Sequence, residues 1–259
     1  MRCGLRTHLD RSRRGSPRGS GLLLLALAIM AMTPQHTTQA AGPEASILSA
    51  IGRLVVDDSR MCTGFVIRSI RRQFASGYSS PVVVYENWLA TAGHCRGEEM
   101  IFRQGGTNHE IVRIIGYSSA DTSGFDIMLL VFFTYLPITA LEPAFGEYPR
   151  IGDKLMLVGY GHNALMMRVG PLRGYDDRGH MEIEGYASAG NSGGPVLIAG
   201  TRRVVGIGIE TTVDRPQGAS SLYCLVAPCG VKPPYVAAHI DRFLGVANFR
   251  DAAAATTPP

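Results

Sequence analysis

The sequence lacks the residue spacings that usually hold a metal ion. It has five cysteines and seven histidines, but no Cys-x-x-Cys pair and no closely spaced pair of histidines. Metal sites in small domains depend on such spacings, because ligands that are close in the chain converge on one ion. We therefore expect no metal site and no cofactor.

The sequence also lacks an N-terminal apolar run long enough to cross a membrane. Residues 21–32 form an apolar run of about 12 residues, whereas a membrane-spanning helix needs about 20. Six arginines precede this run, and small residues follow it around Ala40 and Ala41. This order is typical of a secretory signal peptide, so residues 1–40 are predicted to be a leader that is removed. A membrane anchor is the alternative interpretation.

An excess of positive charge is missing once the leader is removed. The full chain has 25 Lys and Arg against 21 Asp and Glu, but residues 1–40 contain six of the bases and one of the acids. The remaining chain has 19 basic and 20 acidic residues. This balance argues against a nucleic-acid partner, which would need clustered basic side chains.

Four cysteines remain after the leader, an even number that predicts two disulfides in an exported chain. Four cysteines allow three pairings, of which we favour Cys62–Cys95 with Cys224–Cys229.

Residues 41–250 predict a single all-β region. Short apolar runs alternate there with turn signals, and Gly and β-branched residues are frequent. One helix is predicted over residues 234–244, because apolar residues recur in that segment at helical spacing. Residues 251–259, rich in Ala, Thr and Pro, are predicted to be a disordered tail.

The segment 188–195 contains the strongest candidate for a catalytic nucleophile. Its sequence, Ser-Ala-Gly-Asn-Ser-Gly-Gly-Pro, places Ser192 between glycines. Glycine permits a turn that lifts the hydroxyl away from the backbone and directs neighbouring N–H groups at one point. The alternative interpretation is an ordinary glycine-rich hairpin turn.

Two further segments contain side chains that could serve such a nucleophile. His94 follows an apolar strand and precedes Cys95, so a fixed general base is one interpretation and a structural turn histidine is the other. Asp126 opens the apolar run 127–131, where a carboxylate needs a donor such as an imidazole N–H. Asp121 is the competing carboxylate.

Together these segments resemble the chymotrypsin-like (trypsin-type) serine endopeptidases. The matching segments occur in the family's order of His, then Asp, then Ser, and they are residues 91–95, 126–130, 159–161, 190–195 and the residues around Tyr235 and Val236. The resemblance implies an all-β fold of two antiparallel six-stranded β-barrels, with the active site between them and a boundary near residues 136–150. The predicted C-terminal helix would follow the second barrel.

The resemblance implies an endopeptidase that acts on proteins or peptides. The leader predicts that it is secreted or periplasmic, and we expect a monomer without a membrane anchor. His94 would be the general base, Asp126 would orient it, and Ser192 would form an acyl-enzyme. The backbone N–H groups of Gly190 and Ser192 would bind the oxyanion. The cysteine pair Cys62–Cys95 also fits the family, whose equivalent cysteines flank the same strand and histidine.

Two departures from the trypsin pattern affect activation and specificity. Asn191 stands where zymogens have the aspartate of their activating ion pair, so we expect no trypsin-style activation. Asn191 and the segment 62–65 look more like bacterial glutamyl endopeptidases and the high-temperature-requirement proteases. Tyr186 occupies the place of the charged residue at the base of the trypsin pocket, so a preference for Lys or Arg is not supported. The expected pocket residues are Tyr186, Gly206, Ile207, Gly208 and Glu210.

Two other function classes remain open. Residues 190–194 also satisfy the Gly-x-Ser-x-Gly pattern of α/β-hydrolase esterases, in which Asp214 and His239 would complete a triad. The second alternative is an inactive protease scaffold that only binds. The presence of all three triad residue types argues against it.

Overall fold

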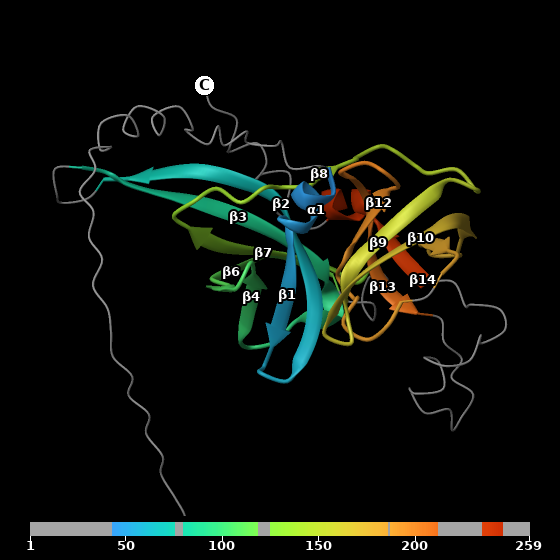
Figure 1. Ribbon diagram of the computed structural model, residues 1–259, viewed down its shortest axis with the longest axis horizontal. Helices are drawn as coiled ribbons and strands as arrows, with labels where there is room; N and C mark the ends of the chain where they lie inside the picture. Colours follow the sequence, from blue (N-terminus) through green and yellow to red (C-terminus); the bar gives the residue numbers. More distant parts are fainter. Residues whose placement is uncertain (1–42, 76–79, 119–124, 186, 212–234, 246–259) are drawn as a thin grey trace, which may run out of the picture. The chain divides into compact units, whose positions relative to one another are not determined.

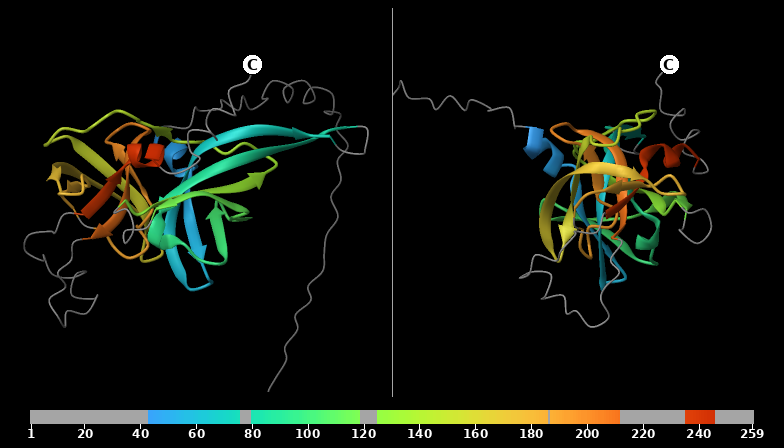
Figure 2. Two further views of the ribbon diagram at one scale, coloured as in Figure 1. Left: turned by 180° about the vertical axis from the view of Figure 1, so that it is seen from behind. Right: turned by 90° about the vertical axis from the view of Figure 1, so that its right-hand side faces the viewer.

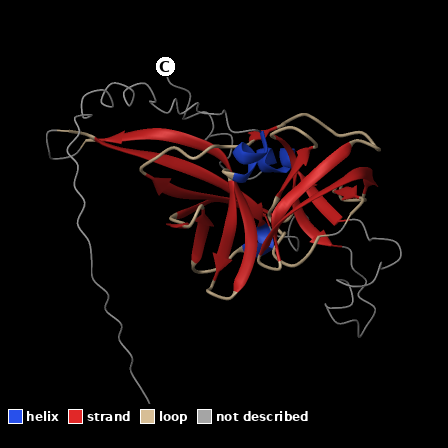
Figure 3. Cartoon of the chain, in the orientation of Figure 1, coloured by secondary structure: helices blue, strands red, loops and turns tan. Residues whose placement is uncertain are grey.

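The computed structural model describes residues 43–75, 80–118, 125–185, 187–211 and 235–245, and strands dominate these ranges (Figures 1 and 3). The helical segments are short, and they are α1 (Pro43–Leu48), η1 (Gly93–Cys95) and η2 (Ile240–Gly245). No helix in these ranges is both long and apolar enough to cross a membrane.

The first half of the described chain forms an antiparallel sheet of seven strands in the order β5-β4-β1-β2-β3-β7-β6. The strands are β1 (Ile51–Val56), β2 (Arg60–Phe74), β3 (Val82–Ala92), β4 (Met100–Gln104), β5 (Thr107–Glu110), β6 (Arg113–Ser118) and β7 (Ile127–Thr134). Among the described residues no pairing joins β5 to β6, so this sheet curves without closing. The predicted first six-stranded barrel is therefore an open sheet with one more strand.

The second half closes into the predicted six-stranded barrel. Its order is β12-β9-β10-β11-β14-β13-β8, and an additional β12–β13 pairing closes the ring of six and leaves β8 outside it. The strands are β8 (Glu142–Pro143), β9 (Lys154–Gly161), β10 (Ala164–Tyr175), β11 (Met181–Ile183), β12 (Pro195–Ile198), β13 (Arg203–Thr211) and β14 (Tyr235–His239). β8 lies in the predicted boundary region and pairs with β13 in parallel.

The predicted C-terminal helix was wrong over most of its length. Residues 235–239 form β14, which lies between β11 and β13, and only a short 3-10 helix, η2, follows. Every β14 residue is buried, so the strand has no polar face and lacks the alternation that would distinguish it from a helix. The apolar spacing was real, but a strand and a 3-10 turn produce it together.

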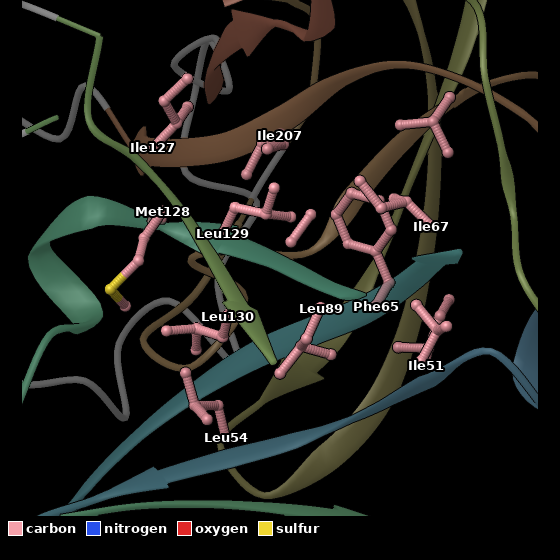
Figure 4. Close-up of a cluster of buried hydrophobic side chains, with 14 of the residues drawn as sticks. Ile51, Leu54, Phe65, Ile67, Leu89, Ile127, Met128, Leu129, Leu130 and Ile207 are labelled. Atoms are coloured by element: carbon pink, nitrogen blue, oxygen red, sulfur yellow. The ribbon is translucent and has the colours of Figure 1, made fainter. Parts of the chain in front are cut away.

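The apolar core joins the two halves. Figure 4 shows Phe65 of β2, Leu129 of β7 and Ile207 of β13 in one cluster. Each of these side chains is 0% exposed, and burial of a side chain of this size contributes roughly 1.5–3 kcal/mol. This shared core therefore fixes the strands of the two halves, and the candidate residues at their ends, relative to one another.

A buried histidine ties the connection between the halves to the C-terminal segment. His239 is 2% exposed. Its Nε2 donates to the Glu147 carbonyl at 2.8 Å, and its Nδ1 accepts from the Asp241 backbone N–H at 3.2 Å. The Tyr148 ring stacks on the imidazole at 4.1 Å between centroids. Only the neutral imidazole can donate at one nitrogen and accept at the other, and burial lowers the pKa of His239.

We expect His239 to make folding stability depend on pH. Its pKa is lower in the folded than in the unfolded chain, so the unfolded state binds more protons below about pH 6.5, and stability falls as the pH drops. The slope is at most about 1.4 kcal/mol per pH unit for one proton. Between pH 5 and 8, the free energy of unfolding of His239→Gln, measured with denaturant, should change less with pH than that of the parent protein. The exposed His162 supplies a control variant, and an unchanged slope in His239→Gln would contradict the assignment.

Candidate active site

Strand register brings Asp126 to the histidine turn. Ala92, the last residue of β3, pairs with Ile127, the first residue of β7. Asp126 and Gly93 therefore meet where the two strands end. A Cβ on Gly93 would lie 3.0 Å from Asp126 Oδ1 and would overlap the Ser118 carbonyl, so the close approach of this turn requires glycine.

The Asp126 carboxylate holds His94 through two hydrogen bonds. The His94 backbone N–H donates to Oδ1 at 2.7 Å, and His94 Nδ1 lies 2.6 Å from Oδ2. Asp126 is 5% exposed, whereas the His94 side chain is 46% exposed. With the Nδ1 proton donated to the carboxylate, Nε2 is left as the acceptor of the ring.

A disulfide fixes the other end of the histidine turn. Cys95 is bonded to Cys62 of β2, with 6.2 Å between their Cα atoms. The two sulfurs and one His94 nitrogen lie within 4.8 Å of one another, but sulfurs bonded to each other supply no thiolate for a metal. The other predicted pair, Cys224–Cys229, lies outside the described residues.

Thr63 ties the serine loop of the second half to β2. Its backbone N–H donates to the Ser192 carbonyl at 2.8 Å, and its hydroxyl donates to the Gly190 carbonyl at 2.7 Å. The same hydroxyl accepts from the Tyr160 N–H at 2.8 Å. Cys95 Sγ lies 4.0 Å from the Ser192 carbonyl. The segment that contains Ser192 therefore lies against the turn that contains His94.

The glycines around Ser192 adopt conformations that other residues resist. Gly190 and Gly193 have φ of +98° and +85°. A Cβ on Gly193 would overlap the Thr91 hydroxyl and the Thr63 carbonyl. The predicted reason for glycine here, a turn that only glycine permits, agrees with this geometry.

A model of the trypsin-like peptidase domain matches residues 62–207, more than half of the chain. The chain belongs to the trypsin-like serine peptidases. Among solved structures it is similar to the serine endoprotease from Yersinia pestis, with a TM-score of 0.59 and 13% sequence identity over 82% of this chain and 68% of that one. At this identity the likeness shows the fold. No curated protein matches the sequence.

In this peptidase a tight turn fixes the peptide bond that precedes Gly190. The His162 N–H donates to the Ala189 carbonyl at 3.0 Å. Because a trans peptide directs its N–H away from its carbonyl, the Gly190 N–H points away from this turn. His162 and Asn163 have φ of +48° and +67° and join β9 to β10 as a two-residue hairpin loop.

Arg53 of β1 braces that turn. Its Nη2 donates to the Asn163 carbonyl at 2.5 Å, and its guanidinium lies 5.0 Å from the centroid of the Tyr160 ring. No pattern in the sequence indicates Arg53 or Thr63, because each contacts a segment about 100 or more residues away. The Gly-His-Asn sequence between two apolar runs was the available signal for the turn.

A cavity of ≈ 80 Å³ lies beside Ser192. Its lining includes Leu157, Ala187, Gly208, Ile209 and Tyr235. Its described side chains carry no charge.

The predicted pocket residues fall in different places. Gly208 lines the cavity beside Ser192. Ile207 is 0% exposed and packs in the core. Gly206 pairs with Val196 and has the Met181 methyl beside it. Tyr186 and the side chain of Glu210 lie outside the described residues.

The Asn191 side chain is buried beside Ser192 and is 2% exposed. Neither its Oδ1 nor its Nδ2 has a hydrogen-bond partner within the described ranges. A buried amide left in this way costs about 1–3 kcal/mol. A carboxylate would cost more at this position unless a cation paired with it, so the neutral residue suits a site without an activating ion pair.

Proposed function

We propose that this trypsin-like peptidase is a secreted endopeptidase that cleaves peptide bonds through His94, Asp126 and Ser192. The observation that supports it most is the pair of hydrogen bonds that the Asp126 carboxylate accepts from the backbone N–H and the ring N–H of His94. The turn that contains His94 also lies against the Ser192 loop. Asp126 would keep the imidazole in the tautomer whose Nε2 accepts a proton, and would stabilise the imidazolium that forms.

The reaction would proceed by acyl transfer in two stages. Ser192 Oγ attacks the substrate carbonyl carbon while its proton passes to His94 Nε2, and the carbonyl oxygen becomes an oxyanion. The backbone N–H groups of Gly190 and Ser192 would bind that oxygen. The imidazolium then protonates the departing amine. In the second stage His94 deprotonates water, which attacks the acyl carbon. The imidazolium then returns that proton to Ser192 Oγ as the bond from Oγ to the acyl group breaks, and the acid product is released.

Secretion is part of the proposal. The Cys62–Cys95 disulfide is typical of an oxidising compartment outside the cytoplasm, which agrees with a leader over residues 1–40. The substrates would be proteins or peptides. The enzyme would act as a monomer, without a metal and without trypsin-style activation. The leader and the tail 251–259 lie outside the described residues.

The esterase alternative does not fit the fold. A nucleophile elbow joins a strand to a helix, but the turn at Ser192 leads into strand β12. The histidine that this alternative requires, His239, is buried and bonded to the Glu147 carbonyl. An inactive scaffold remains the competing function.

Labelling with a serine-directed fluorophosphonate tests the proposal. We expect one equivalent of label on Ser192, because the reagent needs both an activated hydroxyl and an oxyanion site. Peptide mapping by mass spectrometry would locate it. An inactive scaffold would take up no label, and a label on a different serine would reject the assignment.

Arg53→Met should lower kcat by about tenfold and leave KM nearly unchanged. Loss of an oxyanion donor costs about 10²–10³-fold, and a turn that has lost its brace would misplace the Gly190 N–H for part of the time. Steady-state kinetics on a short peptide would measure the effect. Arg53→Lys should restore part of the rate, and Arg103→Met, an exposed position on the neighbouring strand β4, is the matched control. Equal kcat in both Met variants would exclude the bracing role.

A further inference from the structure

The β2–β3 hairpin leaves one strand edge without a neighbour. β1 pairs with β2 only up to Ile51↔Phe65, whereas β2 continues to Phe74. On its other side β2 pairs with β3 over this whole extension. Figures 1 and 2 show the hairpin reaching beyond the other strands of its sheet. Within the described ranges, no strand pairs with this side of β2 over residues 67–74, beyond the Val66 carbonyl, which accepts from the Leu141 N–H at 2.8 Å. An edge of this kind presents backbone N–H and C=O groups to another chain.

One face of this extension has an excess of positive charge. Arg68 and Arg72 lie on the same face because strand residues alternate. Arg72 Nε lies 3.0 Å from Glu86 Oε2, and Arg113 Nη2 lies 3.8 Å from Glu86 Oε1. The guanidinium of Arg68 stacks over the Trp88 ring, 5.2 Å from its centroid. Among the described residues of β2, β3, β6 and β7 on this face, three guanidiniums thus share one carboxylate.

The same charges select against a second copy of this chain. An antiparallel pair of two β2 edges centred on Ile70 would place Arg68 of each copy opposite Arg72 of the other. Like charges in directly opposed positions destabilise a strand pair. A strand with acidic side chains would reverse that sign. Phe74 and Val82, a cross-strand pair at the end of the extension, are 53% and 44% exposed and would offer apolar contact to such a strand.

We propose that the free edge of β2 at residues 67–74 binds an extended acidic segment of another protein by strand addition. Main-chain hydrogen bonds would supply affinity, and carboxylates at alternate positions of the segment would face Arg68 and Arg72. Arg68 and Phe74 lie 6 and 12 residues beyond Cys62, which is about 20 and 40 Å along an extended strand. The surface is therefore distinct from the candidate active site, and the proposal stands apart from the catalytic one.

Peptide binding to the full chain carrying Ser192→Ala tests this proposal without cleavage. The probe is a fluorescent peptide of alternating Glu and Val, and anisotropy measures its Kd. Arg68→Gln with Arg72→Gln should raise Kd by about tenfold, which is about threefold for each ion pair lost at the surface. Arg71→Gln, a matched loss of charge on the opposite face of β2, should change Kd less than twofold. Raising the salt from 50 to 500 mM should weaken binding.

Two modified peptides separate strand addition from simple charge attraction. N-methylation of alternate residues, which blocks main-chain donors along one edge, should abolish binding, and so should replacement of Glu by Lys. If the N-methylated peptide binds as well as the parent, strand addition is overturned. Two other results would also overturn it. One is that the protein binds phosphatidylserine vesicles but no peptide, and the other is that the parent protein forms dimers that the double variant does not form. Thermal unfolding checks that the variants fold, and should the double variant unfold, Arg68→Gln alone should raise Kd about threefold.

Discussion

Ser192→Ala is expected to lower kcat by about 10⁴-fold or more and to leave the fold intact. Without Oγ no acyl-enzyme forms, and only the oxyanion donors and substrate binding would still accelerate hydrolysis. The fold should persist because Ser192 contributes to it through its carbonyl, which accepts from the Thr63 N–H, and alanine retains that carbonyl. Hydrolysis of a peptide substrate and thermal unfolding would measure the two effects.

Ser188→Ala is the matched control for this variant. Ser188 lies in the same loop, and its hydroxyl contacts Met166 Sδ at 3.4 Å, a weak contact that the proposed chemistry does not use. We expect its kcat to stay within a few-fold of the parent. Similar losses in the two alanine variants would point to a disturbed loop, and activity retained in Ser192→Ala would remove the nucleophile from the proposal.

Asp126→Asn is expected to lower kcat by about 10⁴-fold at neutral pH. The amide nitrogen of Asn cannot accept a hydrogen bond from His94 Nδ1, so the imidazole would carry its proton on Nε2. A protonated Nε2 cannot accept the proton of Ser192, and His94 would no longer act as the base. The backbone should tolerate the change, because Asp126 has φ of +47° and Asn adopts this region more readily than most residues. Steady-state kinetics against the parent enzyme would measure the loss.

The molecule contains a second His–Asp pair that serves as the control. Asp176 Oδ2 lies 3.0 Å from His180 Nδ1, and Asp176 Oδ1 accepts from the His180 backbone N–H at 2.8 Å. This arrangement copies that of His94 and Asp126 but joins two residues of the loop between β10 and β11. Asp176→Asn should leave kcat unchanged. A large loss in Asp176→Asn would mean that the Asp126 effect reflects stability and not chemistry.

The sequence was most informative where chemistry and strand signals coincide. Asp126 was preferred over Asp121 because it adjoins the apolar run directly, and register then placed it beside the His94 turn. The closed second barrel followed from the resemblance. The prediction of a helix was wrong at β14, because every residue of this strand is buried and the alternation of apolar and polar residues that marks a strand is absent.

Contacts between distant segments could not be predicted from local pattern. Thr63 and Arg53 have no special signal in their own strands, since threonine and arginine are common on half-buried sheets. Their roles arise only when the fold brings Gly190 and Asn163 to them. The prediction that Ile207 lines the pocket was wrong for a related reason. Its side chain lies on the side of β13 that faces the shared core, and the sequence of β13 alone does not show which side that is.

The division of the candidate triad between the halves has a wider consequence. His94 and Asp126 belong to the open sheet, and Ser192 leads into the closed barrel. Neither half alone holds all three candidate residues, so turnover by this triad would depend on the packing between the two halves. A substitution in the shared core would then lower activity while every strand keeps its own pairing. The packed surface between the halves is therefore a target for inhibitors that bind away from Ser192.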